Sequence, residues 1–170
     1  MGKYKNSGVC KLCDVDTNLC KSHAIPDAIF RRLFRKFSGK AIKLSGDEII
    51  GYTSDSWWDY QLCAACERKL NVAYDKKAIK YLVHEECRVP YGNGVILKSV
   101  VPRVLRMFYI SVLWRAVNSR HPVYASLACN VDSAILKDVK NYILNGVDYP
   151  ENKCMVTLYY LYDRDRKSVV

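Results

Sequence analysis

The sequence predicts one compact α+β protein, in which a treble-clef zinc finger is followed by a mainly helical C-terminal elaboration. Two Cys-x-x-Cys motifs carry this prediction, Cys10-Lys-Leu-Cys13 and, about fifty residues later, Cys63-Ala-Ala-Cys66. The second motif runs directly into the helix-forming residues 67–70. A cysteine pair on a short turn, followed by a pair at the start of a helix, is the ligand order of a treble clef.

The four motif cysteines are predicted to bind one structural Zn²⁺. Each motif aims two thiolates at one point, and two motifs complete a closed tetrahedral site. Disulfides are the alternative for a chain with eight cysteines. No apolar run of the kind found in a signal peptide follows the start Met-Gly-Lys-Tyr-Lys, so we expect a reducing, cytoplasmic setting that favours metal binding. The other cysteines are expected to be small apolar core residues: Cys20, Cys87, Cys129 and Cys154.

The chain is expected to form a zinc unit over 1–88 and a helical unit over 95–170, packed together as one body. Residues 90–94, with one proline and two glycines, are the predicted loop between them. In the first unit we expect a helix from Pro26 to about 37, an irregular or extended stretch over 40–61, and a helix over 64–87 with a break near Asp75. In the second we expect helices over 101–117 and 132–145 and a strand over 155–162.

The charge distribution indicates a nucleic-acid partner. The formal net charge is +10, and residues 88–131 contain no Asp or Glu. Four basic residues of the first predicted helix form the candidate nucleic-acid-binding set: Arg31, Arg32, Arg35 and Lys36. Basic surfaces attract polyphosphates largely independently of base sequence, and simple solubility is the alternative explanation. No membrane contact is expected, because the most apolar stretch, 100–117, is interrupted by three arginines.

The motifs of residues 8–72 resemble those of the HNH, or ββα-metal, nucleases. Many members of that family combine Cys-x-x-Cys, Asp-His-x-x-Pro and Leu-Cys-x-x-Cys-His or -Asn. Here the corresponding elements are Cys10-x-x-Cys13, Ser22-His23-Ala-Ile-Pro26 and Leu62-Cys63-x-x-Cys66-Glu67. The whole chain also resembles a bacterial group without an assigned activity that adds Ser-x-Leu-Trp-Arg, which stands here at 111–115.

The HNH resemblance implies a catalytic site at His23 and Glu67. His23 would be the general base for a water molecule, and Glu67 would bind Mg²⁺ or Mn²⁺ where the family has His or Asn. Ser22 replaces the usual Asp and is a weak ligand. The residues leave two alternatives for His23: a hydrogen-bonded structural role, or a second metal site with Cys20, His84 and Cys87. Glu67 alternatively complements the positive end of its helix.

The function expected from these features is a metal-dependent endonuclease that acts on DNA more than RNA, in phage defence or mobile-element conflict. The alternative is a non-catalytic zinc adaptor or inhibitor that binds nucleic acid or a partner protein. An enzyme should place the His23 ring at an open basic surface beside Glu67, whereas an adaptor can bury it. Arg115 is expected to pair with an acid such as Asp132 or Asp138, with a phosphate-binding cleft as the alternative.

Overall fold

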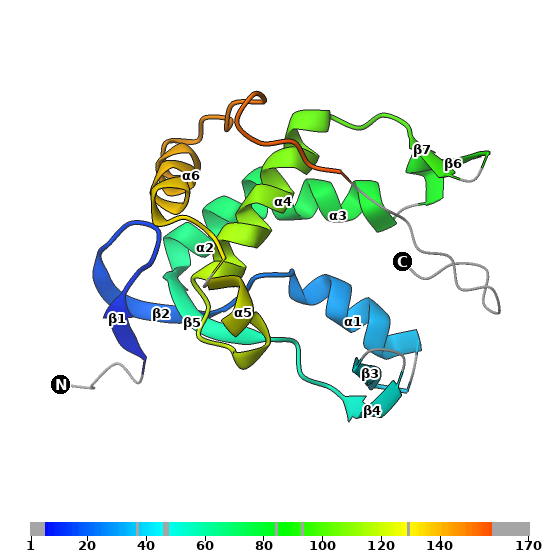
Figure 1. The fold of residues 1–170 in the computed structure, drawn as a ribbon, viewed down its shortest axis with the longest axis horizontal. Helices are drawn as coiled ribbons and strands as arrows, with labels where there is room; N and C mark the ends of the chain where they lie inside the picture. Colours follow the sequence, from blue (N-terminus) through cyan, green and yellow to red (C-terminus); the bar gives the residue numbers. More distant parts are fainter. Residues whose placement is uncertain are drawn as a thin grey trace.

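The structure is a computed structural model that describes residues 6–157, apart from residues 37, 46, 47, 84, 93 and 129. It is a small mixed α/β protein (Figure 1). The strands are β1 Ser7–Val9, β2 Asp16–His23, β3 Ala41–Ser45, β4 Glu48–Thr53, β5 Trp58–Cys63, β6 Arg88–Tyr91 and β7 Gly94–Leu97. The helical elements are α1 Asp27–Lys36, α2 Ala64–Leu70, η1 Asn71–Asp75, α3 Lys76–Val83, η2 Glu85–Cys87, α4 Pro102–Val117, η3 Pro122–Tyr124, α5 Ala125–Ala128 and α6 Ser133–Asn145.

A three-stranded antiparallel sheet supports the cysteine motifs. Its strand order is β1-β2-β5, and the register places Ser22 opposite Asp59 and His23 opposite Trp58. The first Cys-x-x-Cys motif lies in the turn between β1 and β2. The second begins at Cys63, the last residue of β5 and the N-cap of α2. The sheet therefore brings together two motifs that are far apart in the sequence.

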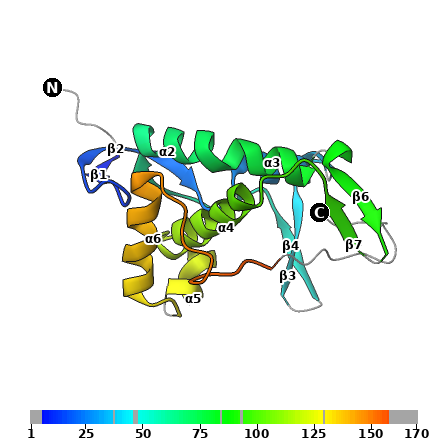
Figure 2. The ribbon, with the colours of Figure 1, turned by 90° about the horizontal axis from the view of Figure 1, so that it is seen from above.

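α2, η1 and α3 follow one another without a break and form a long helical rod (Figure 2). The middle segment is a π-helix, in which the backbone N–H of Lys76 donates to the carbonyl of Asn71. A π-turn contains an extra residue, so it rotates the following helix relative to a regular α-helix. In place of the break expected near Asp75, the helix continues through this π-turn, in which Tyr74 and Asp75 are both buried.

α4 lies at the centre of the molecule, where α3 and α6 pack against it (Figure 1). One cluster of buried side chains draws on the sheet, the long rod, α4 and α6. Representative members are Leu12, Leu62, Leu70, Phe108, Trp114 and Ile143. Residues from both expected units therefore share one apolar core.

The helices expected over 101–117 and 132–145 are confirmed. Pro102 occupies the first turn of α4, where its missing N–H removes no helical hydrogen bond. In α6, the Asp132 carboxylate accepts a hydrogen bond from the Ala134 N–H, and Gly146 ends the helix at φ 68°. Local capping signals of this kind can be recognised in a sequence because both partners lie within a few residues.

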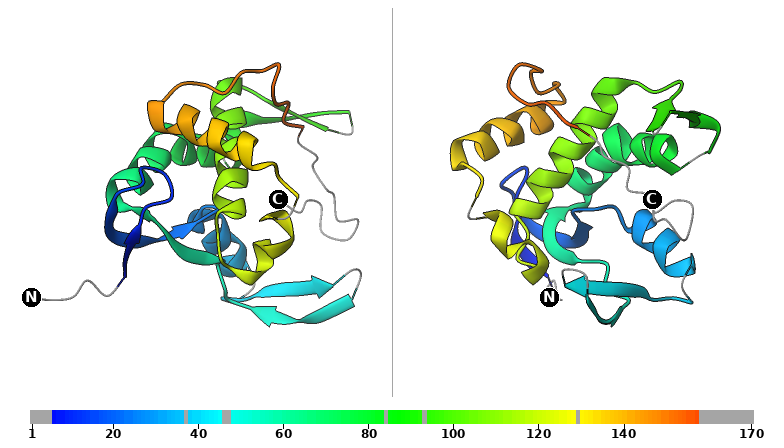
Figure 3. Two further views of the ribbon diagram at one scale, coloured as in Figure 1. Left: turned by 60° about the vertical axis from the view of Figure 1, so that its left-hand side comes forward. Right: turned by 45° about the vertical axis from the view of Figure 1, so that its right-hand side comes forward.

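The strand expected over 155–162 is wrong for residues 155–157, which form no strand, and its remainder lies outside the described residues. The loop expected over 90–94 is largely the β6–β7 hairpin, and the stretch 40–61 contains the β3–β4 hairpin and part of β5. The two hairpins project from the body in the same direction (Figure 3). Pro90 is compatible with β6 because this two-stranded sheet leaves each strand one free edge.

Candidate metal centre and its surroundings

The four motif cysteines form a compact thiol cluster. The sulfur atoms of Cys10, Cys13, Cys63 and Cys66 all lie within 4.8 Å of one another, and the Cys13 and Cys63 sulfurs are 3.9 Å apart. A tetrahedral zinc ion with Zn–S bonds of about 2.3 Å requires sulfur–sulfur distances of about 3.8 Å. The cluster therefore fits a metal ion such as zinc. Within the described part of the chain it is the one cluster of at least three His, Cys, Asp or Glu side chains with metal-binding spacing.

Backbone hydrogen bonds prepare the cluster for a thiolate. Burial raises the pKa of the Cys10 thiol, but N–H groups at Cys13, Cys63 and Leu12 more than offset this and lower the pKa to about 7. The Cys63 N–H donates to the Cys10 sulfur over 3.3 Å. Burial and the neighbouring sulfurs raise the pKa of the Cys66 thiol. A bound cation would compensate for the burial of several thiolates at one point.

The other described cysteines lie outside this cluster. Cys87 is buried, as expected of a core residue, whereas Cys20 and Cys154 are only partly buried. Cys129 and His84 lie outside the described residues, so the proposed ligand set of Cys20, His23, His84 and Cys87 stays a prediction.

His23 is the last residue of β2, and its side chain is 17% exposed. Its Nε2 lies 3.0 Å from the Ser56 hydroxyl oxygen and 3.8 Å from the Asp27 carboxylate. Burial lowers the pKa of the imidazole, and the nearby Asp27 carboxylate opposes this shift. A neutral, hydrogen-bonded ring suits a general base, but protein groups already contact the nitrogen that would have to receive a proton.

Ser22 and Glu67 lie beside each other in the interior. The Ser22 side chain is fully buried, and its hydroxyl oxygen accepts a hydrogen bond from the Leu62 N–H at 3.2 Å. Burial raises the pKa of the Glu67 carboxyl, and hydrogen bonding to Ser22 and the charge of Arg115 only partly oppose it. One Glu67 oxygen is buried and has no hydrogen-bond partner among the described residues. Ser22 and Glu67 are therefore neighbours, whereas His23 and Glu67 share no hydrogen bond or ion pair, and the catalytic roles that the HNH resemblance implies for His23 and Glu67 stay predictions.

A buried ion pair lies next to this group. Arg115 of α4 donates two hydrogen bonds to Asp75, at 2.9 and 2.8 Å, and the two side chains are 1% and 7% exposed. The Arg115 Nε also donates to the Ser111 carbonyl. The expected structural pair is present, but the expectation of Asp132 or Asp138 as its acid is wrong. Asp132 caps α6 and Asp138 pairs with Lys153 instead.

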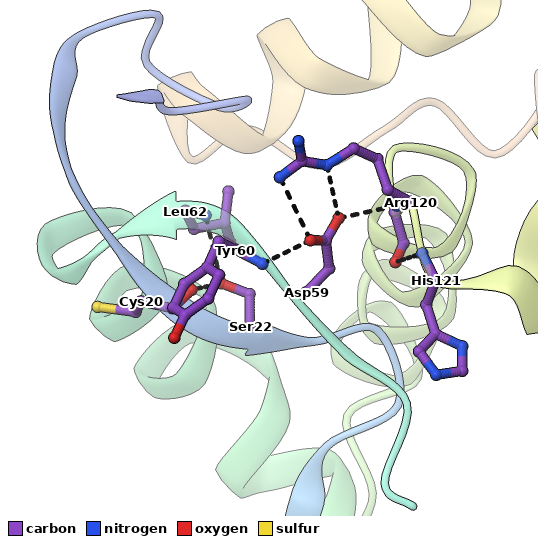
Figure 4. Close-up of polar contacts among 8 residues, drawn as sticks. Cys20, Ser22, Asp59, Tyr60, Leu62, Arg120 and His121 are labelled. Atoms are coloured by element: carbon purple, nitrogen blue, oxygen red, sulfur yellow. Dashed lines mark hydrogen bonds and ion pairs between the residues drawn. The ribbon is translucent and has the colours of Figure 1, made fainter. Parts of the chain in front are cut away.

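Asp59, in β5, and Asp55, just before β5, form hydrogen bonds with the segment after α4. The Asp59 carboxylate accepts hydrogen bonds from the Arg120 backbone N–H at 2.8 Å and from the Tyr60 N–H at 2.7 Å, with the Arg120 guanidinium beside it (Figure 4). Asp55 contacts the His121 Nε2 at 2.9 Å. Both carboxylates are therefore occupied by protein groups. Gln61 is almost fully buried, and its amide atoms have no hydrogen-bond partner in the described structure.

Trp57 and Trp58 are both partly buried, and each contacts other side chains. Trp57 packs edge-on against Phe30 and Tyr124, with ring centroids 5.1 and 6.1 Å apart. Trp58 packs against Tyr60, and the Lys21 ammonium lies 4.2 Å from the centre of its ring. These contacts connect α1, β5 and the segment after α4.

The basic side chains of α1 differ in exposure and in whether they form an ion pair. Arg31 pairs with Asp27 at 2.8 Å, and Arg35 is exposed with its Nε donating to the Arg31 carbonyl. Arg32 is half-buried, and its Nε has no hydrogen-bond partner in the described part of the chain. The Lys36 side chain is not among those described. The role of this set in nucleic-acid binding stays a prediction.

None of the described helices is both long enough and apolar enough to cross a membrane. No protein-family model, curated protein or solved structure matches the chain.

Proposed function

We propose that this chain is a zinc-stabilised protein of the HNH-like treble-clef type that binds nucleic acid without cleaving it. One observation carries the proposal: the thiol cluster lies where a turn between two strands meets the start of a helix. The order of turn, hairpin and helix supports a treble-clef arrangement, in which α1, β3 and β4 would be an insertion between the hairpin strands β2 and β5. Zinc held at this point would join the two halves of the unit.

The surroundings of His23 favour binding over hydrolysis. The ring is mostly buried and its Nε2 is engaged by Ser56 and Asp27, so a water nucleophile would have to displace a protein contact. The Ser22 hydroxyl oxygen already accepts a hydrogen bond from the Leu62 N–H. Asp55 and Asp59, the nearby acids, are paired with His121 and Arg120. A non-catalytic protein has no need for an open imidazole, so these contacts fit the adaptor alternative.

The residues around His23 do not fit a resident Mg²⁺ or Mn²⁺. These ions prefer several oxygen ligands with open positions for water and substrate. The carboxylates nearest His23, Asp27 and Asp55, already pair with Arg31 and His121. Glu67 and the Ser22 hydroxyl are largely or fully buried. We therefore assign no catalytic step to a second metal ion.

An HNH-type endonuclease is the second candidate, and one observation favours it. The Glu67 carboxylate keeps a buried oxygen without a hydrogen-bond partner in the described structure, and it lies beside Ser22, the residue before His23. A buried carboxylate oxygen without a partner is costly, and a ligand would satisfy it. In this candidate His23 is the base and DNA the substrate, in phage defence or mobile-element conflict. A partner protein that the finger recruits remains compatible with either candidate.

A plasmid assay with added Mg²⁺ or Mn²⁺ separates the two candidates. The proposal predicts that wild-type protein retards the plasmid in a gel and leaves it supercoiled with either metal. His23→Ala and Glu67→Gln should behave in the same way if they fold. Nicking by wild type that His23→Ala abolishes, at unchanged zinc content and thermal stability, would replace the proposal with the endonuclease.

A further inference from the structure

The rod formed by α2, η1 and α3 has a one-sided distribution of charge. Five basic side chains along it are exposed: Arg68, Lys69, Lys76, Lys77 and Lys80. Its two acids, Glu67 and Asp75, instead face the interior. Within the described residues, no carboxylate lies within ion-pair distance of any of the five bases. The sequence of the rod is mixed in charge, but its exposed charged side chains are all basic.

The π-turn contributes to this distribution. It buries Asp75 against Arg115 and keeps the helix after it in register, so that Leu70, Tyr74 and Ala78 all face the core. In an uninterrupted α-helix, the side chains from Lys76 onward would point in directions rotated from those that they have here. The bases before and after the turn consequently occupy the side opposite the core. Figure 2 shows the rod along one edge of the molecule, with α4, α5 and α6 away from that edge.

A pocket of about 190 Å³ adjoins this basic side. Lys69, Lys77 and Arg103 contribute to its wall, together with Tyr74, Val104 and Ile143. Arg103 pairs with Asp148 at 3.1 Å, and Lys69 donates a hydrogen bond to the Leu144 carbonyl. Lys77 has no such contact with a described residue. The first turn of α4, which lines the pocket, has neither an acidic residue nor a side-chain cap. Asp148 also lines this pocket and neutralises Arg103, so the unpaired positive charge at the pocket comes from the rod.

We infer that the exposed side of the rod, defined by Arg68, Lys69, Lys76, Lys77 and Lys80, is the main contact surface for the phosphate backbone of a nucleic-acid duplex. This inference builds on the proposed function and names the surface that performs it. A helical rod of this length spans about 30 Å, close to the 34–36 Å of one turn of B-form DNA. The exposed lysines and the arginine of the rod would release counterions when they contact phosphates, and the rod has no exposed carboxylate that would repel the phosphates. The surface on α1 is weaker in this respect, because Arg31 is already paired with Asp27.

Two double variants of equal charge test the inference. Lys76→Gln/Lys80→Gln removes two bases from the rod. Lys98→Gln/Lys137→Gln removes two exposed lysines from other parts of the molecule and is the matched control. Binding of a fluorescent DNA duplex of arbitrary sequence is measured by anisotropy across a range of salt concentrations, without Mg²⁺ or Mn²⁺. Circular dichroism and zinc content confirm that each variant is folded.

The rod variant should bind about tenfold more weakly or worse near 0.1 M salt, and the slope of log K against log salt should become shallower by about 1.8, which is two lost phosphate contacts. The control should retain most of the affinity. Equal effects of the two variants would overturn the inference while leaving nucleic-acid binding in place. Tighter, equally lysine-dependent binding to polyglutamate or to phosphatidylserine vesicles would overturn it in favour of an acidic protein or a membrane surface. Weaker binding by the rod variant alone would support the rod as the contact surface, even if the wild-type protein cleaves the duplex.

Discussion

Arg115 and Asp75 form a two-point ion pair in the interior, with N–O distances of 2.9 and 2.8 Å across forty residues of sequence. Asp75 ends the π-turn of the long rod, and Arg115 lies near the end of α4. The pair therefore links the helix that starts at the second cysteine motif to the central helix of the core. The Arg115 charge also acts on Glu67 and on His23, so the pair contributes to the electrostatics around each of these side chains.

Breaking this pair should destabilise the protein strongly. Arg115→Met leaves the Asp75 carboxylate buried without its partner, and such losses cost about 3–5 kcal/mol. Urea unfolding followed by circular dichroism measures the change. The double variant Arg115→Met/Asp75→Asn is the control, and we expect it to lose clearly less than the sum of the two single variants. Additive losses would show that the two side chains do not interact.

Zinc should be required for folding of the cysteine-bearing unit. Cys63→Ser removes one of four ligands, and since binding free energy is folding free energy in such sites, the variant should lose both zinc and ordered structure. Elemental analysis and circular dichroism measure the two effects. Cys154→Ser, outside the thiol cluster, should keep one zinc per chain. Wild-type protein that folds without metal, or that contains a Cys10–Cys13 disulfide in the cell, would contradict this prediction.

His23 should titrate at a lower pH than a free histidine. Burial lowers the pKa of its ring, so the unfolded chain binds a proton before the folded chain does as the pH falls below about 6.5. Its contribution to the free energy of unfolding is fully present above that pH and declines between about 6.5 and the lower folded pKa. NMR titration of the ring protons gives the pKa directly, with His23→Gln identifying the signal. A midpoint at or above 6.5 would contradict the expected sign.

The N-cap of α6 should be worth a measurable part of the stability. Asp132→Ala removes the carboxylate that accepts from the Ala134 N–H at 2.7 Å, at a cost of about 1 kcal/mol. Urea unfolding provides the measurement. Ser133→Ala, which keeps the capping oxygen, is the control and should have a smaller effect. Equal losses in the two variants would indicate that the hydrogen bond does not stabilise the helix.

Features set by nearby residues could be predicted from the sequence, and features set by distant contacts could not. The ends of α6 and the start of α4 follow from Asp132, Gly146 and Pro102, which act on their own helices. The cysteine cluster was also predictable, because the Cys-x-x-Cys spacing is a local signal even though the two motifs lie far apart. The β3–β4 and β6–β7 hairpins were not predicted as hairpins, because their strands are short and contain Gly51 or Pro90.

The basic side of the rod was missed for a different reason. Glu67 and Asp75 make the sequence of this segment look mixed in charge, and only the fold shows that both acids face inward. Asp75 is buried because of the π-turn and Arg115, neither of which can be read from a helical pattern. The attention given to α1 followed from its dense run of arginines, yet the structure pairs Arg31 with Asp27 and half-buries Arg32.

The most direct test of the central claim is the salt dependence of nucleic-acid binding by the wild-type, zinc-loaded protein. Anisotropy titrations with two labelled duplexes of unrelated sequence give the association constant at several salt concentrations. The account predicts similar affinities for both duplexes and a steep linear decrease of log K with log salt, because the contacts are to phosphates. Absence of binding at low salt, or binding that does not change with ionic strength, would contradict it.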